Sequence, residues 1–239
     1  MIKKSLALLF TLVFFIACTD SSNTKGNGNN SGNENTANGF DINSTVKTQN
    51  ISIELKKALA YMGNEERLAF DIYNKFYGFY DDVNQFNNIA TKSEVKHISA
   101  VQDLIQRYDV NGTELSDSNF TTLSYQNYDI SDMQPGVYGV TSVQNLYDAL
   151  VIEASSDKIG ALKVACKVEV TDIDDLEKYL VIAKNESATD IISAFDFLIE
   201  GSYKHYWAFD KALKNEGITN GCNLGIDGFG DKIGIYPNN

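Results

Sequence analysis

The chain has 239 residues, of which 43% are hydrophobic, and this length and composition suit one globular domain with appendages. Its 32 acidic and 20 basic residues give a formal net charge of -12, which argues against nucleic acid or anionic lipid as a partner through charge alone. Only two prolines occur, so long uninterrupted helices are allowed.

The N-terminus has the layout of an export signal. Two lysines precede an apolar run from Leu6 to Ala17, which is too short to remain as a membrane-spanning helix. Ala17 and Cys18 resemble the processing site of bacterial lipoproteins. We therefore expect residues 1–17 to be a signal peptide. Cys18 would carry the lipid that anchors the exported protein to a bacterial cell membrane, on its periplasmic or cell-surface face. A plain cleaved signal is the alternative.

Residues 18–50 are rich in Asn, Ser, Gly and Thr and have almost no large apolar side chains. Such a segment cannot bury enough surface to fold. We therefore expect the lipidated cysteine to be followed by a disordered tether with no chemistry of its own. The folded domain is expected to span residues 51–216.

The first two helices are predicted from apolar residues that recur at alternating steps of three and four, the pattern of a helix packed in a bundle. The first is expected over residues 51–80, with Glu66 in its apolar stripe and with Gly63-Asn64 as a point where it could break or kink. The second is expected over residues 86–108. Glu94 and His97 lie in its stripe three residues apart, so they share one helical face.

A connection of about 30 residues separates the second helix from the third, which is unusually long for a compact domain. It runs from Asp109 to Thr141 and is rich in Asn, Ser, Asp and Gly. A four-helix bundle with one long crossover between its second and third helices explains this length. Thr141-Ser142-Val143-Gln144 fits a capping box, so a short helix over residues 143–153 is expected within the crossover.

The third helix is expected over residues 156–183 and the fourth from residue 187 onward, both with the same apolar alternation. Glu169 occupies the stripe of the third helix, and Asp172 lies one turn later. His205 occupies the stripe of the fourth helix. The elements in chain order therefore predict an all-α fold.

Residues 217–239 form a glycine-rich tail that we expect to be coil, because its acidic residues are not spaced as a calcium loop requires. Cys222 lies in this tail, and Cys166 lies in the apolar stripe of the third helix. In an exported, oxidising context the two cysteines could pair. The sequence alone leaves this open, since a free cysteine in such a stripe is most often a small buried hydrophobe.

Each of the four predicted helices places at least one metal-capable side chain in its apolar stripe. The set is Glu66, Glu94, His97, Glu169, Asp172 and His205. Unpaired buried carboxylates are costly, so their convergence implies mutual compensation. Two divalent cations bridged by carboxylates, with one imidazole on each, provide it, and this set of oxygen and nitrogen ligands suits iron or manganese. A metal-free hydrogen-bond network with both histidines protonated is the alternative.

Two motifs resemble the first metal-binding helices of the rubrerythrin branch of ferritin-like proteins. They are Glu66 with alanine three and tyrosine seven residues later, and Glu94-Val95-Lys96-His97. Further segments, including Leu146-Tyr147-Asp148-Ala149-Leu150 and Gly201-Ser202 before His205, resemble an uncharacterised ferritin-like family labelled domain of unknown function 2202. The resemblance covers roughly residues 52 to 215 and implies a ferritin-like up-down four-helix bundle.

By this resemblance Glu66 is a terminal or bridging ligand, and Glu94 is a bridging carboxylate with His97 beside it. Glu169 is the carboxylate of the third helix. Related di-iron proteins have a glutamate three residues before the histidine of the last helix, whereas this chain has Ser202 at that position. Glu200 lies on a different face.

The second metal position is therefore short of one carboxylate unless Asp172 supplies it. A single-metal or weakly loaded site is the alternative.

The N-terminal signal predicts a membrane-anchored protein, and the resemblance implies two iron ions as its cofactor, manganese being the alternative. Its expected activity is redox chemistry with oxygen or peroxide, of peroxidase or ferroxidase type. The chain has no Cys-x-x-Cys motif, so an external electron donor is expected.

Lipid anchoring does not suit a closed storage cage, and homo-oligomerisation is left open. The competing interpretation is a non-enzymatic surface module for metal binding or interaction, with a structural or single-metal site.

Overall fold

The computed structural model describes residues 39–110, 132–154 and 157–237, and within these ranges it contains helices and no strand. The helices are η2 (Ile42–Ser44), α1 (Ile53–Phe79), α2 (Asn84–Ile89), the π-helical turn η3 (Ala90–Glu94), α3 (Val95–Arg107), α5 (Thr141–Ala154), α6 (Lys158–Asn185) and α7 (Thr189–Asn215). The all-α prediction is confirmed. The expected signal peptide, Cys18 and residues 111–131 of the expected crossover lie outside the described residues.

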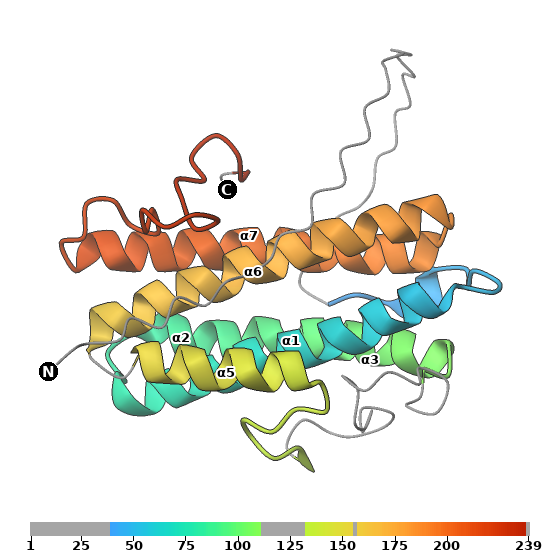
Figure 1. Cartoon of the computed structure of the whole chain (residues 1–239), viewed down its shortest axis with the longest axis horizontal. Coiled ribbons are helices and arrows are strands. Elements are labelled where there is room, and N and C mark those ends of the chain that lie inside the picture. Colours follow the sequence, from blue (N-terminus) through green and yellow to red (C-terminus); the bar gives the residue numbers. More distant parts are fainter. Residues whose placement is uncertain (1–38, 111–131, 155–156, 238–239) are drawn as a thin grey trace, which may run out of the picture. The chain divides into compact units, whose positions relative to one another are not determined.

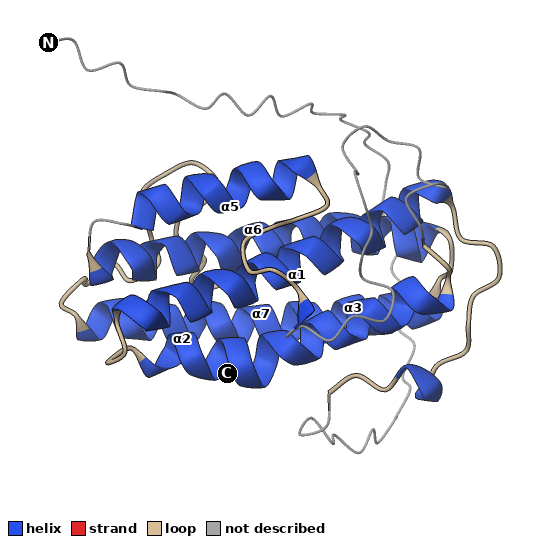
Figure 2. Ribbon diagram, turned by 90° about the horizontal axis from the view of Figure 1, so that it is seen from below, coloured by secondary structure: helices blue, strands red, loops and turns tan. Residues whose placement is uncertain are grey.

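The long helices form a bundle. Figure 1 shows α1 and α7 running in one direction and α3 and α6 in the opposite one. The runs α2, η3 and α3 follow one another without a break and pack against α1, while α6 packs against both α1 and α7. Figure 2 shows α5 lying along α6 and α1 on the outside of the bundle. Within the described residues, no helix is long and apolar enough to cross a membrane.

Polar side chains define where the helices begin. The hydroxyl of Ser52 accepts a hydrogen bond from the backbone N–H of Leu55 at 3.0 Å at the start of α1. The carboxylate of Asp157 accepts one from Gly160 at 2.7 Å at the start of α6. Each satisfies an N–H group that has no partner inside the helix.

Helix α1 continues through Gly63, where the sequence suggested a break. A Cβ atom at this position would lie 3.1 Å from Cδ1 of Ile105 in α3. The glycine therefore allows α3 to approach α1 closely, and packing between the two helices outweighs its low helix propensity.

Two apolar clusters fill the bundle. Along α1, one cluster lies before residue 63 and the other lies after residue 67. One cluster includes Tyr73, Phe86 and Phe209. The other includes Leu59, Leu104 and Phe195. A layer of buried polar side chains separates them, and all of its α1 members, Asn64 to Arg67, are at most 3% exposed. The apolar clusters on both sides of this layer keep its ionisable groups away from water.

Residues 39–50, which the sequence analysis assigned to the tether, lie against the bundle. The guanidinium of Arg107 in α3 donates to the carbonyl of Ile42 at 2.7 Å and to the hydroxyl of Thr45 at 2.9 Å. The rings of Phe40 and Phe197 lie 6.2 Å apart. The expectation of a tether reaching residue 50 is therefore wrong for this part, because its few apolar side chains and its backbone carbonyls find partners on α3 and α7.

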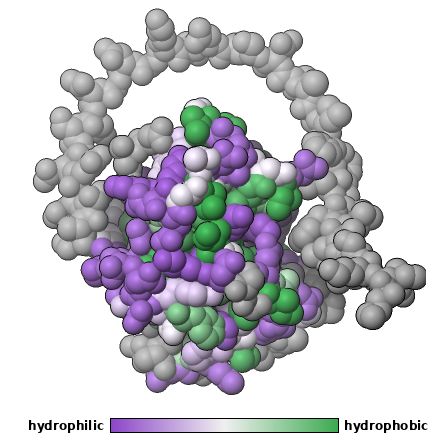
Figure 3. Space-filling view, turned by 90° about the vertical axis from the view of Figure 1, so that its left-hand side faces the viewer, coloured by the Kyte–Doolittle hydropathy of each residue, from purple (hydrophilic) through white to green (hydrophobic). Residues whose placement is uncertain are grey.

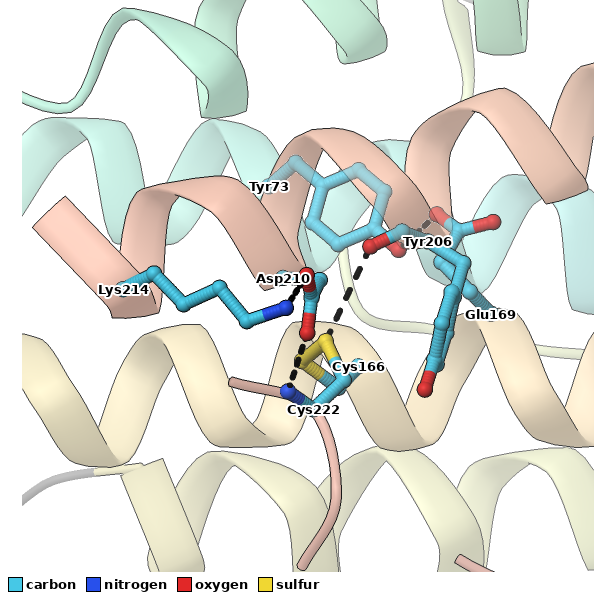
Figure 4. Close-up of a disulfide and its surroundings, with 7 residues drawn as sticks. All are labelled: Tyr73, Cys166, Glu169, Tyr206, Asp210, Lys214 and Cys222. Atoms are coloured by element: carbon cyan, nitrogen blue, oxygen red, sulfur yellow. Dashed lines mark hydrogen bonds and ion pairs between the residues drawn. A yellow bond between two sulfur atoms is a disulfide. The ribbon is translucent and has the colours of Figure 1, made fainter. Parts of the chain in front are cut away.

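The C-terminal tail contains turns and no helix up to residue 237, and it is fastened to the bundle. A disulfide joins Cys222 in the tail to Cys166 in α6 (Figure 4), which settles the pairing that the sequence left open. The backbone N–H of Cys222 also donates to Asp210 at 2.9 Å. Cys166 lies three residues before Glu169, so the tail is attached to α6 one turn away from a predicted ligand.

Exposed large apolar side chains are dispersed over the described surface. Figure 3 views the end of the bundle at the left of Figure 1, where hydrophobic groups lie in separate patches among hydrophilic ones. Phe79, at the end of α1, is 67% exposed. Scattered exposed apolar residues are normal for a globular protein.

Candidate metal centre

The buried polar layer brings together five of the six predicted ligands. Glu66 comes from α1, Glu94 from the end of η3, His97 from α3, Glu169 from α6 and His205 from α7. Each is at most 5% exposed. Four different parts of the chain therefore contribute carboxylates or imidazoles to one water-poor position.

The contacts divide into two halves that share Glu94. In one half, Nδ1 of His97 lies 3.0 Å from Oε2 of Glu66 and 3.1 Å from Oε2 of Glu94. In the other half, Nδ1 of His205 lies 3.1 Å from Oε1 of Glu94 and 3.4 Å from Oε2 of Glu169. Each oxygen of Glu94 thus faces a different histidine, and each histidine has a second glutamate of its own.

The two imidazoles lie side by side, with ring centroids 5.3 Å apart and planes inclined by 28°. One ligand atom each from Glu94, His97 and His205 falls within 4.8 Å of the other two. We call Glu66, Glu94, His97, Glu169 and His205 the two-histidine centre.

Glu94 is positioned by the π-helical turn η3, which interrupts the α-helical run between α2 and α3. A π-helix bonds residue i to residue i+5, and single turns of this kind occur mostly inside α-helices, frequently at functional sites. Here the turn ends at Glu94 itself and also contains Ser93, whose hydroxyl lies 2.6 Å from Nε2 of His205. The sequence carried no signal for this turn.

Gly201 in α7 makes room for His97. A Cβ atom at residue 201 would lie 2.2 Å from Nε2 and 2.6 Å from Cε1 of His97, closer than side chains can approach. The ring of Phe197, one turn earlier on α7, contacts His97 edge-on at 5.6 Å between centroids. The imidazole is therefore held between an aromatic ring and bare backbone.

Tyr73 supports the other half of the centre. Its hydroxyl donates a hydrogen bond to Oε1 of Glu169, and its ring packs on Phe86 and Phe209 (Figure 4 shows Tyr73 beside Glu169). Because Oε1 receives this bond, Oε2 of Glu169 is the oxygen left to face His205. The resemblance to rubrerythrins used this tyrosine only as a motif position, and its contact with Glu169 required the tertiary structure.

Charge compensation within the centre changes the pKa of every member. Burial by itself would lower the pKa of both histidines. The surrounding carboxylates outweigh it and raise the pKa of His97 to about 9 and of His205 to about 10. The same imidazoles lower the pKa of Glu94 to about 2 against the effect of burial. Burial raises the pKa of Glu66, and it raises that of Glu169 to about 7.

Glu94, His97 and His205 place ligand atoms close enough together to hold a metal ion. The contact between Nδ1 of His97 and Oε2 of Glu66 is a hydrogen bond of 3.0 Å. Nδ1 of His205, Oε2 of Glu94 and Oε1 of Glu66 are buried without a hydrogen-bond partner. Buried polar atoms are normally satisfied, so these atoms favour ligands around an ion over a closed hydrogen-bond network.

Asp172, the sixth predicted ligand, lies next to the centre and is 4% exposed. Its Oδ2 accepts a hydrogen bond from the hydroxyl of Ser202 at 2.6 Å, and its Oδ1 has no hydrogen-bond partner. No ion pair joins it to either histidine among the described residues. Glu169 is thus the carboxylate that accompanies His205, and Asp172 pairs with the serine that replaces the glutamate expected in α7.

Glu65 is a buried carboxylate that the sequence analysis did not single out. It is 2% exposed, and neither of its oxygens has a hydrogen-bond partner. Its position directly before Glu66 places it on the adjacent side of α1, outside the apolar stripe that was used to find ligands. The packing of α6 against α1 covers this side of the helix.

Comparison with known proteins identifies the family. Residues 55–223 match the family described as "Uncharacterized protein domain (DUF2202)". A protein of Methanocaldococcus jannaschii named "Uncharacterized protein MJ0754" is 33% identical over 174 residues, covering 73% of this chain and 83% of the relative. The crystal structure of hypothetical protein MJ0754 superimposes with a TM-score of 0.59 at 32% identity, covering 72% of this chain and 87% of the other. This chain therefore belongs to the DUF2202 family.

Proposed function

We propose that this chain is a membrane-anchored, ferritin-like metal protein whose two-histidine centre binds two iron or two manganese ions. The observation that carries the proposal is the position of Glu94, which directs its two oxygens at two different histidines. Glu94 would contribute a ligand to both ions, and Glu66 and Glu169 would each contribute a ligand to one of them. An equal division of ligands favours two ions over one.

The ferritin-like fold is supported by the helix directions and by the long connection before α6. In such bundles the first and last helices run parallel, and one crossover traverses the bundle before the third helix starts. The directions of α1, α3, α6 and α7 in Figure 1 agree with this order.

Two adjacent transition-metal ions, when bound, supply the paired one-electron changes that reactions with oxygen or peroxide require. The residues of the chain set the conditions for this chemistry. Tyr73 holds one oxygen of Glu169, and Ser93 holds the distal nitrogen of His205, so the ligands are oriented from outside the centre. The apolar clusters on both sides exclude bulk water. Iron or manganese suits this mixture of imidazole and carboxylate.

Electrons for turnover would come from a separate protein or small molecule. Cys166 and Cys222 are joined to each other, and no Cys-x-x-Cys pair occurs in the sequence. The disulfide is also what export to an oxidising compartment predicts. This agrees with the proposed signal peptide and lipid on Cys18, through which the protein would be held at a bacterial membrane.

Elemental analysis tests the metal centre. The protein is purified after growth with iron and manganese, and about two ions per chain are expected, as for bundles with this ligand set. His97→Ala and His205→Ala variants that fold should lose them. A wild-type protein without stoichiometric transition metal would refute the proposal.

A second measurement separates redox chemistry from a purely structural ion. A redox centre changes its absorption when oxygen or peroxide is added to the reduced protein. A structural site shows no such change and loses only thermal stability on chelation.

A further inference from the structure

Glu65 is a buried carboxyl group without a counter-charge beside the two-histidine centre. Both of its oxygens lie inside the protein without a hydrogen-bond partner, and the side chain is 2% exposed. A buried carboxylate normally has an imidazole, an arginine or several N–H groups to stabilise it. Glu65 has none of these as hydrogen-bond partners, so something else must offset its burial.

Two aspartates of α6 face the same part of α1. Residues 172, 175 and 179 follow one another at steps of three and four, which places them on one face of α6. On α1, Tyr61 and Glu65 are separated by one turn in the same way. The rings of Tyr61 and Tyr179 are in edge contact at 5.9 Å. Because α1 and α6 run in opposite directions (Figure 1), this contact brings Glu65 opposite Asp175.

The three carboxylates differ in exposure. The side chain of Asp175 is 22% exposed, whereas Asp172 is 4% and Glu65 2% exposed. Oδ1 of Asp172 is a further buried oxygen without a hydrogen-bond partner. Asp175, Glu65 and Asp172, which we call the acidic row, therefore lead from the surface between α1 and α6 toward Glu66.

Little positive charge balances the acidic row. Lys178 lies 3.5 Å from Asp175 at the outer end, and its side chain is 63% exposed. Tyr61 donates a hydrogen bond to Asp175 and closes the outer end with Tyr179.

We propose that the acidic row is a transit site for divalent cations, which binds an ion at the α1–α6 surface and passes it to the two-histidine centre. The inference rests on the proposed function, because it assigns a route to the ions of that centre. Carboxylate oxygens without imidazole hold hard divalent cations loosely. The histidines and Glu94 then offer a stronger site at the inner end. Rows of like charge with low-dielectric walls raise the local concentration of counter-ions and their rate of arrival by about 10-fold to 1,000-fold.

The experiment measures how fast ions reach the centre and how many remain there. The purified full chain is stripped with chelator and mixed with Co²⁺ alone. Growth of the visible absorption of Co²⁺ bound to imidazole gives the rate, and elemental analysis after equilibration gives the content. The variants are Glu65→Gln and the partly exposed Asp175→Asn. Glu54→Gln is the matched control, because Glu54 is an exposed glutamate in the first turn of the same helix.

Glu65→Gln is expected to slow filling by about 10-fold and Asp175→Asn by a smaller factor, with the final content unchanged. Glu54→Gln should fill at the wild-type rate. Wild-type rates in both row variants would overturn the transit site and leave the centre intact. A lower final content in Glu65→Gln would also overturn it, because Glu65 would then be a ligand of the centre. A wild-type protein that takes up no Co²⁺ would overturn both proposals. If the wild-type protein takes up Co²⁺, the rates of the two variants test the transit site alone.

Discussion

The two-histidine centre and the acidic row are adjacent groups of buried carboxylates with opposite electrostatic situations. In the centre, each carboxylate faces an imidazole within 3.4 Å, and the pKa of Glu94 falls to about 2. In the acidic row, Glu65 has only other carboxylates and a distant lysine around it, and its pKa rises. Burial is nearly the same in both. Glu94, which faces both imidazoles, therefore differs from Glu65 at similar burial, whereas burial still raises the pKa of Glu66 and of Glu169 in the centre.

The largest expected effect comes from removing either histidine of the two-histidine centre. His97→Ala and His205→Ala each leave a buried carboxylate without its partner, which costs about 3–5 kcal/mol of unfolding free energy in the metal-free protein. Metal content should fall below one ion per chain. One ion per chain would remain if the unaltered half of the centre still bound its ion. Urea unfolding and elemental analysis measure the two effects. Wild-type metal content in both variants would show that the ions bind elsewhere.

Replacing a glutamate with glutamine should change the unfolding free energy in opposite directions in the two regions. In chelator-treated protein, Glu94→Gln removes the anion between two imidazolium groups and should lower the unfolding free energy by about 3 kcal/mol. Glu65→Gln removes a buried carboxyl group that folding must keep neutral or leave without a counter-charge, and should raise the unfolding free energy by about 1 kcal/mol. Urea unfolding at neutral pH measures both variants side by side. Equal destabilisation by the two substitutions would contradict the assignment of Glu65 to an uncompensated position.

Gly201→Ala tests how closely the centre is packed. The added Cβ must displace His97, so we expect a loss of about 1–3 kcal/mol and weaker metal binding. Gly78→Ala is the matched control, because Gly78 lies in α1 with nothing within 4 Å of an added Cβ. That substitution should stabilise the helix by about 0.5–1 kcal/mol. Thermal unfolding and metal titration of both variants distinguish a specific clash from a general glycine effect.

The smallest effect is a dependence on pH that separates a metal centre from a metal-free network. In the metal-free protein, the folded-state pKa values of about 9 for His97 and 10 for His205 lie above the ordinary 6.5. Their contribution to stability is complete below pH 6.5 and is lost as pH rises through 9 to 10. Ions compete with protons for the imidazoles, so the stabilisation by added metal should instead grow from pH 6 to 8. Thermal unfolding with and without metal across this range measures both slopes.

The histidines and Glu66, Glu94 and Glu169 could be predicted from the sequence because each interrupts a stripe that is otherwise apolar. A three-four alternation is a local property, and it survives any rearrangement of the helices relative to one another. The same reasoning placed Asp172 among the ligands, one turn from Glu169. The structure adds a hydrogen bond from Ser202 to Asp172, because the register between α6 and α7 decides which side chains meet.

Other features had no local signature. The π-helical turn that ends at Glu94, the space left by Gly201 and the contact of Tyr73 with Glu169 depend on neighbours distant in sequence. So does the attachment of residues 39–50 through Arg107. The composition of that segment predicted disorder, since composition describes what a segment can bury by itself and not what a bundle can offer to it.

The sequence by itself predicted the long helices and five candidate ligands in their apolar stripes, because periodicity and residue type are properties of single segments. Only the tertiary structure decided that the oxygens of Glu94 are shared between two histidines, and that Glu65 faces Asp175 without a counter-charge. These are distances between helices, and they follow from the directions and registers in which α1, α3, α6 and α7 pack.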